Sequence, residues 1–383
     1  MLKGKFGWKN HSFLIIVATL AMAVLGLGLH DMGAQVGSTS QITLPNCPEK
    51  CGNITIPYPF GIGDKCHYNH PEDGKFYNVS CDSSKVPKYG GLEIDKITVD
   101  GEFHVINDIS YICYDNNGTK TACSCHRSWI RVTRFAISTT RNVIGAIGCD
   151  TYAVFSGTRM SSSSGFVTGC VTGCSNQSDV GTECSGIGCC EVSMPKGVTN
   201  ISISTRSLNH HRNVQMFNPC STAFIVAKNH GQSDKLLPYS IKSIITKDVA
   251  YFKHQKNLLN PIVYDWTIGR KNCEQAKLDK KHYLCKGNTL CYDLSPHQWG
   301  YRCKCKSGFQ GNPYLHDCQD IDECAEEKKS GTLCKEPAWC VNTIGSYNCS
   351  CPPGYSRGNG TFNDPCIADD KSNDLPIIFK IIG

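Results

Sequence analysis

Oxygen-bearing side chains gather on both sides of a cysteine near the end of the sequence. The segment Asp320–Cys324 reads DIDEC, so three acidic residues fall within four positions directly before that cysteine. Asn342 follows in the segment CVNTIGSYNCSC. Calcium prefers about six to eight oxygen ligands from carboxylates, amide carbonyls and backbone carbonyls. Asp320, Glu323 and Asn342 could therefore supply part of a calcium site; the alternative is a solvated acidic linker.

A repeat of cysteines must position these oxygens. Twelve cysteines lie between Cys273 and Cys366 in two sets of six, and each set has C-x-C as its fourth and fifth members. A Gly-aromatic step follows each C-x-C, as SGF at 307–309 and PGY at 353–355. Units of about 45 residues are too small for a good hydrophobic core, so disulfides must stabilise them. Spacing alone leaves their connectivity open.

This spacing resembles the epidermal growth factor-like (EGF-like) module across Cys273 to Cys366. The resemblance implies that the first cysteine of each set bonds the third, the second the fourth and the fifth the sixth. The implied pairs are Cys273–Cys291, Cys285–Cys303, Cys305–Cys318, Cys324–Cys340, Cys334–Cys349 and Cys351–Cys366.

The second unit also resembles the calcium-binding subclass of the module, whose pattern is D-x-D-E-C followed by C-x-N-x4-Y-x-C-x-C. The resemblance implies that Ile321, Thr343 and Ser346 add backbone carbonyls to the three side chains named above. It also implies that Tyr347 packs against the preceding module and that Asp322 is a supporting charge. The first unit lacks the acidic prefix, so we assign it no calcium.

The composition indicates a secreted chain. The sequence has 383 residues and 26 cysteines, an even count that favours disulfides over metal binding or free thiols. Basic residues precede an apolar run over Phe13–Leu29, which predicts a signal peptide over residues 1–34, the alternative being an uncleaved membrane anchor. Sequons predict N-glycans at Asn53, Asn78, Asn117, Asn176, Asn200 and Asn359.

The region from Cys47 to Asn272 reads as a β-rich, disulfide-stapled domain. Leu92–Asp108 alternates apolar and polar residues around an Asp100–Gly101 turn signal, which predicts a hairpin. Asn142–Phe155 is typical of a buried strand pair, and Gly197–Thr205 alternates again. The segment after Cys220 lacks cysteines until Cys273, and we expect it to complete this domain.

Several segments resemble the extracellular region of plant wall-associated receptor kinases: CPEKCGNITIPYPFGIG from Cys47, AIGCDTYA from Ala146, GIGCCEVSMPKGVTNISIS from Gly186 and GFQGNPYLHDCQDIDEC from Gly308. The resemblance implies a galacturonan-binding domain that holds pectin, an acidic polysaccharide. Members of that family continue through a membrane helix into a kinase, and this sequence shows neither. It could be a natural secreted form or a truncated receptor.

Basic residues are the candidates for holding an acidic polymer. The net charge is +6, and the stretch 116–149 has five basic residues and no acid. Arginine can grip a carboxylate bidentately. The candidate ligand-binding residues are therefore Lys120, Arg127, Arg131, Arg134 and Arg141; the alternative is a scattered, solvated basic surface. Trp129 could stack on sugar rings, the alternative being a place in the core.

The sequence thus predicts a mainly β, disulfide-rich protein in five parts: a signal peptide (1–34), a galacturonan-binding domain (47–272, cysteine-rich core 47–220), an EGF-like module (273–318), a calcium-binding EGF-like module (320–366) and a tail (367–383). We expect Ca²⁺ as cofactor, pectin and other extracellular proteins as partners, no nucleic acid, no catalysis, and an extracellular or cell-wall location. The alternative function is a structural or protein-interaction spacer.

Overall fold

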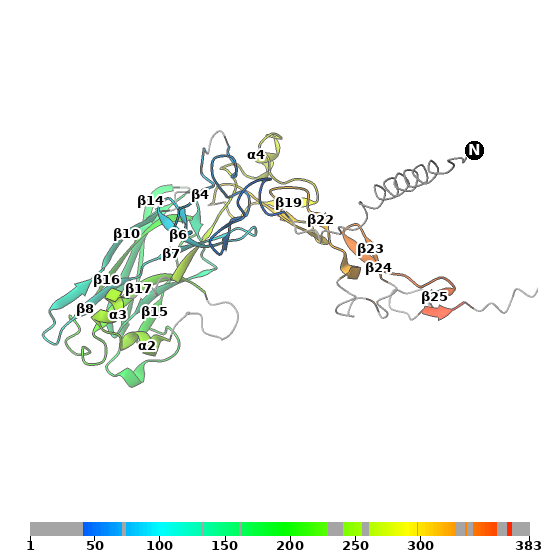
Figure 1. The fold of residues 1–383 in the computed structure, drawn as a ribbon. Coiled ribbons are helices and arrows are strands. Elements are labelled where there is room, and N and C mark those ends of the chain that lie inside the picture. Colours follow the sequence, from blue (N-terminus) through cyan, green and yellow to red (C-terminus); the bar gives the residue numbers. More distant parts are fainter. Residues whose placement is uncertain are drawn as a thin grey trace, which may run out of the picture. The chain divides into compact units, whose positions relative to one another are not determined.

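The three-dimensional structure is a computed structural model (Figure 1). It describes residues 41–70, 74–131, 134–160, 162–228, 240–254, 260–296, 298–325, 334, 340–357 and 366–369. The predicted signal peptide, Asn359 and the tail beyond residue 369 lie outside the described residues. Within the described ranges, no helix is both long and apolar enough to cross a membrane.

Three large sheets and one two-stranded sheet lie in the described part of the chain before Cys273. The four-stranded sheet has the order β10 (His126–Arg131), β16 (Val198–Arg206), β13 (Asp150–Arg159), β14 (Ser162–Gly173). The five-stranded sheet has the order β15 (Cys189–Glu191), β12 (Asn142–Ile147), β17 (Cys220–Ala227), β8 (Ser110–Tyr114), β9 (Lys120–Cys123). The seven-stranded sheet has the order β11 (Ala136–Ile137), β18 (Asn260–Asp265), β7 (Glu102–Asn107), β6 (Leu92–Ile97), β5 (Pro87–Tyr89), β4 (Asn78–Cys81), β3 (Gly61–Ile62). Shorter elements are β1 (Lys50–Cys51), β2 (Ile54–Thr55), the 3-10 turn η1 (Gln177–Asp179), α2 (Ile241–Ile245) and α3 (Val249–His254).

The predicted hairpin over residues 92–108 is confirmed. Strands β6 and β7 pair antiparallel, with Ile97 opposite Phe103. The turn between them needs a left-handed residue, and Gly101 supplies it at φ +106° while its N–H donates to the Thr98 carbonyl at 3.2 Å. Strand β18 then pairs with β7, so the segment after Cys220 contributes a strand to the seven-stranded sheet.

The prediction that residues 142–155 form a strand pair is only half right. Both strands exist, but β12 pairs with β15 and β17, whereas β13 pairs with β14 and β16. The chain passes from one sheet to the other between them. An apolar run predicts a buried strand, but it does not say which strand lies alongside.

The five-stranded sheet is covered on both faces, which explains why every residue of β12 is buried. Ile144 and Ala146 belong to the larger core, which they share with the four- and seven-stranded sheets. Val143 and Ile147 belong to a second core, to which α2 and α3 contribute Ile241, Ile244, Ile245 and Phe252. Strands buried on both sides lose the apolar–polar alternation and read as continuous apolar runs.

The C-terminal cysteines lie among short ladders. Their elements are α4 (Cys273–Lys277), β19 (Thr289–Tyr292), β20 (Arg302–Cys305), β21 (Phe309–Gln310), β22 (Gln319–Asp320), β23 (Cys340–Thr343), β24 (Ser346–Cys349), β25 (Tyr355–Arg357) and β26 (Cys366–Ala368). The disulfides here are the six pairs that the EGF-like resemblance implies. Upstream the pairs are Cys47–Cys66, Cys51–Cys81, Cys113–Cys220, Cys123–Cys125, Cys149–Cys174, Cys170–Cys190 and Cys184–Cys189.

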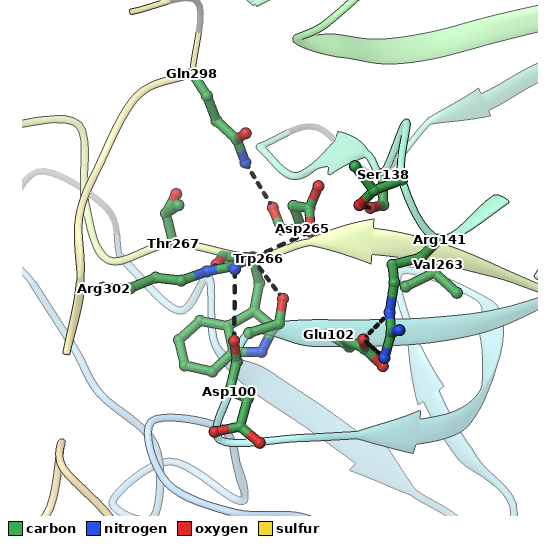
Figure 2. A network of polar contacts seen from close by, with 12 residues as sticks. Asp100, Glu102, Ser138, Arg141, Val263, Asp265, Trp266, Thr267, Gln298 and Arg302 are labelled. Atoms are coloured by element: carbon green, nitrogen blue, oxygen red, sulfur yellow. Dashed lines mark hydrogen bonds and ion pairs between the residues drawn. The ribbon is translucent and has the colours of Figure 1, made fainter. Parts of the chain in front are cut away.

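A buried arginine joins the first six-cysteine unit to the β-rich region (Figure 2). Arg302, at the start of β20, is 6% exposed. Its guanidinium donates to the backbone carbonyls of Trp266 at 2.7 Å and Gly101 at 2.6 Å, and lies 3.4 Å from the Asp265 carboxylate. The hairpin turn and the end of β18 are thereby tied to the module.

Candidate functional site

The candidate calcium ligands lie at the start of the second six-cysteine unit. Asp320 ends β22, which pairs with β21 of the preceding unit, so its backbone belongs to the joint between the units. Asn342 lies on β23, which forms a hairpin with β24. The Cys324–Cys340 disulfide, with a Cα–Cα distance of 5.5 Å, brings the two segments together.

Asp320 lies at the centre of this arrangement. Its Oδ2 accepts a hydrogen bond from Asn342 Nδ2 at 2.8 Å. Its Oδ1 accepts the backbone N–H of Gly345, at the tip of the β23–β24 hairpin. The structure therefore places the carboxylate beside the Asn342 amide, whose oxygen would face a cation after the side chain rotates by half a turn.

The other predicted ligands are Ile321 and Glu323, which follow Asp320, and Thr343 and Ser346 of the β23–β24 hairpin. The Ile321 carbonyl accepts the Glu323 N–H at 3.1 Å, and the Ser346 carbonyl accepts the Thr343 hydroxyl at 2.8 Å. A carbonyl oxygen has a second lone pair, so these bonds leave each acceptor able to meet a cation. The Glu323 Oε2 is buried without a hydrogen-bond partner in the described part of the chain. A buried carboxylate oxygen needs compensation, and a hard cation supplies it, so this donor set fits calcium.

Two glycines at the joint had no place in the prediction. A side-chain carbon on Gly308 would lie 2.0 Å from the Gly345 carbonyl oxygen, and one on Gly345 would lie 2.7 Å from the Phe309 ring. Ile321 donates its N–H to the Gly308 carbonyl at 2.9 Å. Phe309 of the preceding unit thus lies against this hairpin. The sequence signals for this close approach were the glycines within Ser307–Phe309 and Ile344–Ser346.

Asp322 has a local role. Its carboxylate accepts the backbone N–H of Ala325 at 2.9 Å, and its side chain is exposed. The bond closes a short turn on Asp322's own segment.

The predicted polysaccharide-binding residues have different surroundings. Lys120 is exposed on β9, at the edge of the five-stranded sheet. Arg127 and Arg131 lie on β10, at the edge of the four-stranded sheet, and their side chains, like that of Trp129, lie outside the described residues. The Arg134 guanidinium lies 4.6 Å from the centre of the Phe76 ring.

Arg141 forms an ion pair with Glu102 on β7 (Figure 2). His104 Nε2 lies 2.9 Å from the other Glu102 oxygen. Burial raises the pKa of Glu102, but the hydrogen bonds to His104 and Arg141 outweigh it and leave that pKa below its ordinary value. The Arg141 charge is thus already neutralised by Glu102. The residues around Arg141 in the sequence do not indicate this partner.

Two protein families match parts of the chain. Residues 47–118 match "Wall-associated receptor kinase galacturonan-binding", and residues 320–366 match "Calcium-binding EGF domain". Neither of the two matched domains is a catalytic domain. No solved structure matches the chain.

Curated relatives match over most of this chain. Wall-associated receptor kinase 2 of Arabidopsis thaliana is 34% identical over 312 residues, which are 81% of this chain and 39% of that protein. Wall-associated receptor kinase 5 is 32% identical over 85% of this chain and 41% of its own length, and wall-associated receptor kinase 1 is 32% identical over 92% and 43%. The chain thus spans about 40% of the length of these relatives. It is a homologue of the wall-associated receptor kinases that carries their galacturonan-binding domain and a calcium-binding EGF domain.

Proposed function

We propose that this chain acts outside the cell as a receptor-type binding region, holding galacturonan through residues 47–272 and one calcium ion through residues 320–366. The match of residues 47–118 to a galacturonan-binding family carries the polysaccharide half of the proposal. The thirteen disulfides support an extracellular location, because reducing compartments do not sustain such a framework. No catalytic step is proposed.

Three of the five basic residues are the best first candidates for contact with the polymer. Lys120 is exposed on the edge strand β9, and Arg127 and Arg131 belong to the edge strand β10. Arg134 lies over an aromatic ring and Arg141 pairs with a carboxylate, so their loss would also disturb the fold. Galacturonate presents regularly spaced carboxylates that arginine can bind bidentately.

The polysaccharide proposal is tested by measuring oligogalacturonide binding across a salt series, with and without calcium. We expect binding at low salt that weakens as salt screens the charges. The triple variant Lys120→Ala, Arg127→Ala, Arg131→Ala should bind at least about tenfold more weakly, a loss of about 1.4 kcal/mol. Lys304→Ala, which removes an exposed charge from β20 in the first EGF-like unit, is the control and should bind as wild type.

Absence of binding at low salt would refute the pectin proposal and favour a spacer role. Binding that needs calcium but is unaffected by the triple variant would indicate calcium-bridged carboxylates instead. Release of reducing ends from pectin would overturn the non-catalytic assignment.

The calcium proposal rests on Asp320, Asn342 and Glu323, with the carbonyls of Ile321, Thr343 and Ser346 completing the oxygen set. When bound, the ion would supply a divalent charge that joins the β22 end to the β23–β24 hairpin. The residues themselves hold these segments in place through the Asp320–Asn342 and Asp320–Gly345 hydrogen bonds.

Two neighbouring aspartates provide a matched test of this assignment. Asp320→Asn removes one charge from a proposed ligand, whereas Asp322→Asn removes one charge from a residue that closes a turn, a task asparagine also performs. Calcium titration calorimetry should show the dissociation constant raised by about tenfold or more for Asp320→Asn and by much less for Asp322→Asn. Equal effects of the two would show that the site responds only to net charge.

Glycan attachment is proposed at three of the sequons. Asn53, Asn117 and Asn176 are exposed. Asn200 is engaged in the β13–β16 ladder, donating to Thr158 Oγ1 at 2.7 Å and accepting from the Thr158 N–H at 3.0 Å, and the Asn78 Oδ1 is buried. Mass spectrometry of the secreted protein should find Asn200 less occupied than the exposed three.

A further inference from the structure

Two histidines and one carboxylate converge away from the calcium residues. His70 lies in the β-rich region, and Asp279 and His282 follow α4 in the first EGF-like unit. His282 Nδ1 lies 3.0 and 3.1 Å from the Asp279 oxygens, and His70 Nε2 lies 4.0 Å from Asp279 Oδ2. One potential ligand atom from each residue lies within 4.8 Å of the others, and all three residues are half-buried.

The local structure holds together the backbone segments that carry the three side chains. Asp279 and His282 are three residues apart on a turn in which the Asp279 carbonyl accepts the N–H of His282 at 3.1 Å and of Tyr283 at 2.9 Å. The buried Tyr68 hydroxyl donates to the His282 carbonyl at 2.7 Å. Since Tyr68 is two residues from His70, this bond holds both histidine-bearing segments side by side.

A cavity of about 20 Å³ adjoins the cluster, which is room for one water molecule or ion. Arg270 and Lys271 also line it. Their positive charges disfavour a hard cation held by charge alone, such as calcium. A borderline metal differs, because neutral imidazole nitrogens bind it through coordinate bonds.

We propose that His70, Asp279 and His282 bind one divalent transition-metal ion of the zinc class, with water as a further ligand. Two histidines and one carboxylate form a familiar zinc ligand set that leaves a position open. Metal–ligand bonds of about 2.0–2.1 Å place tetrahedral ligand atoms about 3.3 Å apart. The two separations that involve Asp279, 3.0 and 4.0 Å, lie on either side of that value, and the two histidine nitrogens lie within 4.8 Å of each other, so side-chain rotations would close the site.

Such an ion would join the β-rich region to the first EGF-like unit. It would do so independently of the polysaccharide and calcium proposals, because none of its ligands takes part in them. Because the metal would bind the folded chain and not the unfolded chain, it would also raise the unfolding temperature.

The test is a titration of the secreted full chain with Co²⁺ in excess calcium, which keeps the calcium residues occupied. Intense visible absorption from Co²⁺ reports a protein site of low coordination number, such as a tetrahedral one, and Zn²⁺ should displace it at one equivalent. His70→Ala, Asp279→Asn and His282→Ala should each weaken binding at least about a hundredfold, since loss of a ligand exceeds the 10–100-fold cost of losing its supporting partner. His316→Ala, an exposed histidine of the same unit, should leave binding unchanged.

Metal-free unfolding temperatures of the variants separate loss of a ligand from loss of the fold, and His70→Gln serves where His70→Ala unfolds. Absence of a stoichiometric Co²⁺ or Zn²⁺ site in the wild type would overturn the proposal. So would retention of wild-type affinity in folded His70 and His282 variants, or an equal loss in His316→Ala.

Discussion

The two joints of this chain are held by different kinds of contact. Where the β-rich region meets the first EGF-like unit, the contacts are buried: Arg302 donates to backbone carbonyls of Trp266 and Gly101, and Asn312 donates to the Tyr58 carbonyl at 2.7 Å. Where the two EGF-like units meet, the contacts are half-exposed: Asp320 accepts from Asn342 and Gly345.

This difference indicates what each joint needs. Buried hydrogen bonds to backbone carbonyls need no ion from outside the protein. They are costly to break because the carbonyls would be left unpaired. The second joint gathers oxygens instead, including the buried Glu323 Oε2, which has no hydrogen-bond partner among the residues that the structure describes. We therefore expect the first joint to persist without calcium and the second to depend on it.

The largest expected effect is the loss of Arg302. In Arg302→Ala the carbonyls of Trp266 and Gly101 and the Asp265 carboxylate lose a buried partner. Breaking a buried charged contact costs about 3–5 kcal/mol. The free energy of unfolding in guanidinium chloride should fall by that amount, with or without calcium.

Lys304→Ala is the control for this variant, because Lys304 lies on the same strand but is exposed. It should change the free energy of unfolding by no more than about 0.5 kcal/mol. If Arg302→Ala were equally mild, the first joint would not rest on this side chain. If its effect vanished on removing calcium, the contrast between the joints would fail.

The next effect, at the second joint, comes from Gly308→Ala. The added carbon would meet the Gly345 carbonyl oxygen, and Gly308 has φ +78°. A non-glycine residue in this region costs about 1–3 kcal/mol before the collision is counted. Because the collision pushes the β23–β24 hairpin away from Asp320, calcium calorimetry should show a dissociation constant raised about tenfold or more.

Gly311→Ala separates backbone strain from collision. Gly311 also has a positive φ, +121°, but an added carbon there meets nothing within 4 Å. It should destabilise the protein while leaving calcium affinity close to that of wild type. A similar loss of calcium affinity in both variants would show that strain, and not the approach of Gly308 to Gly345, controls the joint.

The two joints also differ in how far the sequence predicted them. The proximity of Asp320 and Asn342 could be predicted from residue types, spacing and the resemblance to a calcium-binding module, because that pattern is local. The role of Arg302 could not be predicted, since a single arginine before C-x-C belongs to no periodic pattern. Its partner Gly101 is 201 residues away.

The same limit applies within the β-rich region. The hairpin at 92–108 was predictable because both its strands and its turn are contiguous in sequence. The separation of β12 and β13 into two sheets depends on strands distant in the chain, such as β17 and β16. Arg141 was chosen for its charge, yet its partner Glu102 lies 39 residues earlier.

The smallest expected effect concerns pH at the Glu102 cluster, near Arg302 (Figure 2). The folded-state pKa of Glu102 is lowered, so its contribution to stability is complete above its unfolded pKa, about 4.3, and is lost as pH falls through the lower folded value. In Glu102→Gln the unfolding temperature should therefore lie below that of wild type at neutral pH, and the gap should narrow on acidification below pH of about 4. Glu93→Gln, an exposed change on the neighbouring strand β6, should show no such pH-dependent gap. A gap for Glu102→Gln that widens with acid would mean that the pKa is raised, and that burial outweighs Arg141 and His104 beside the first joint.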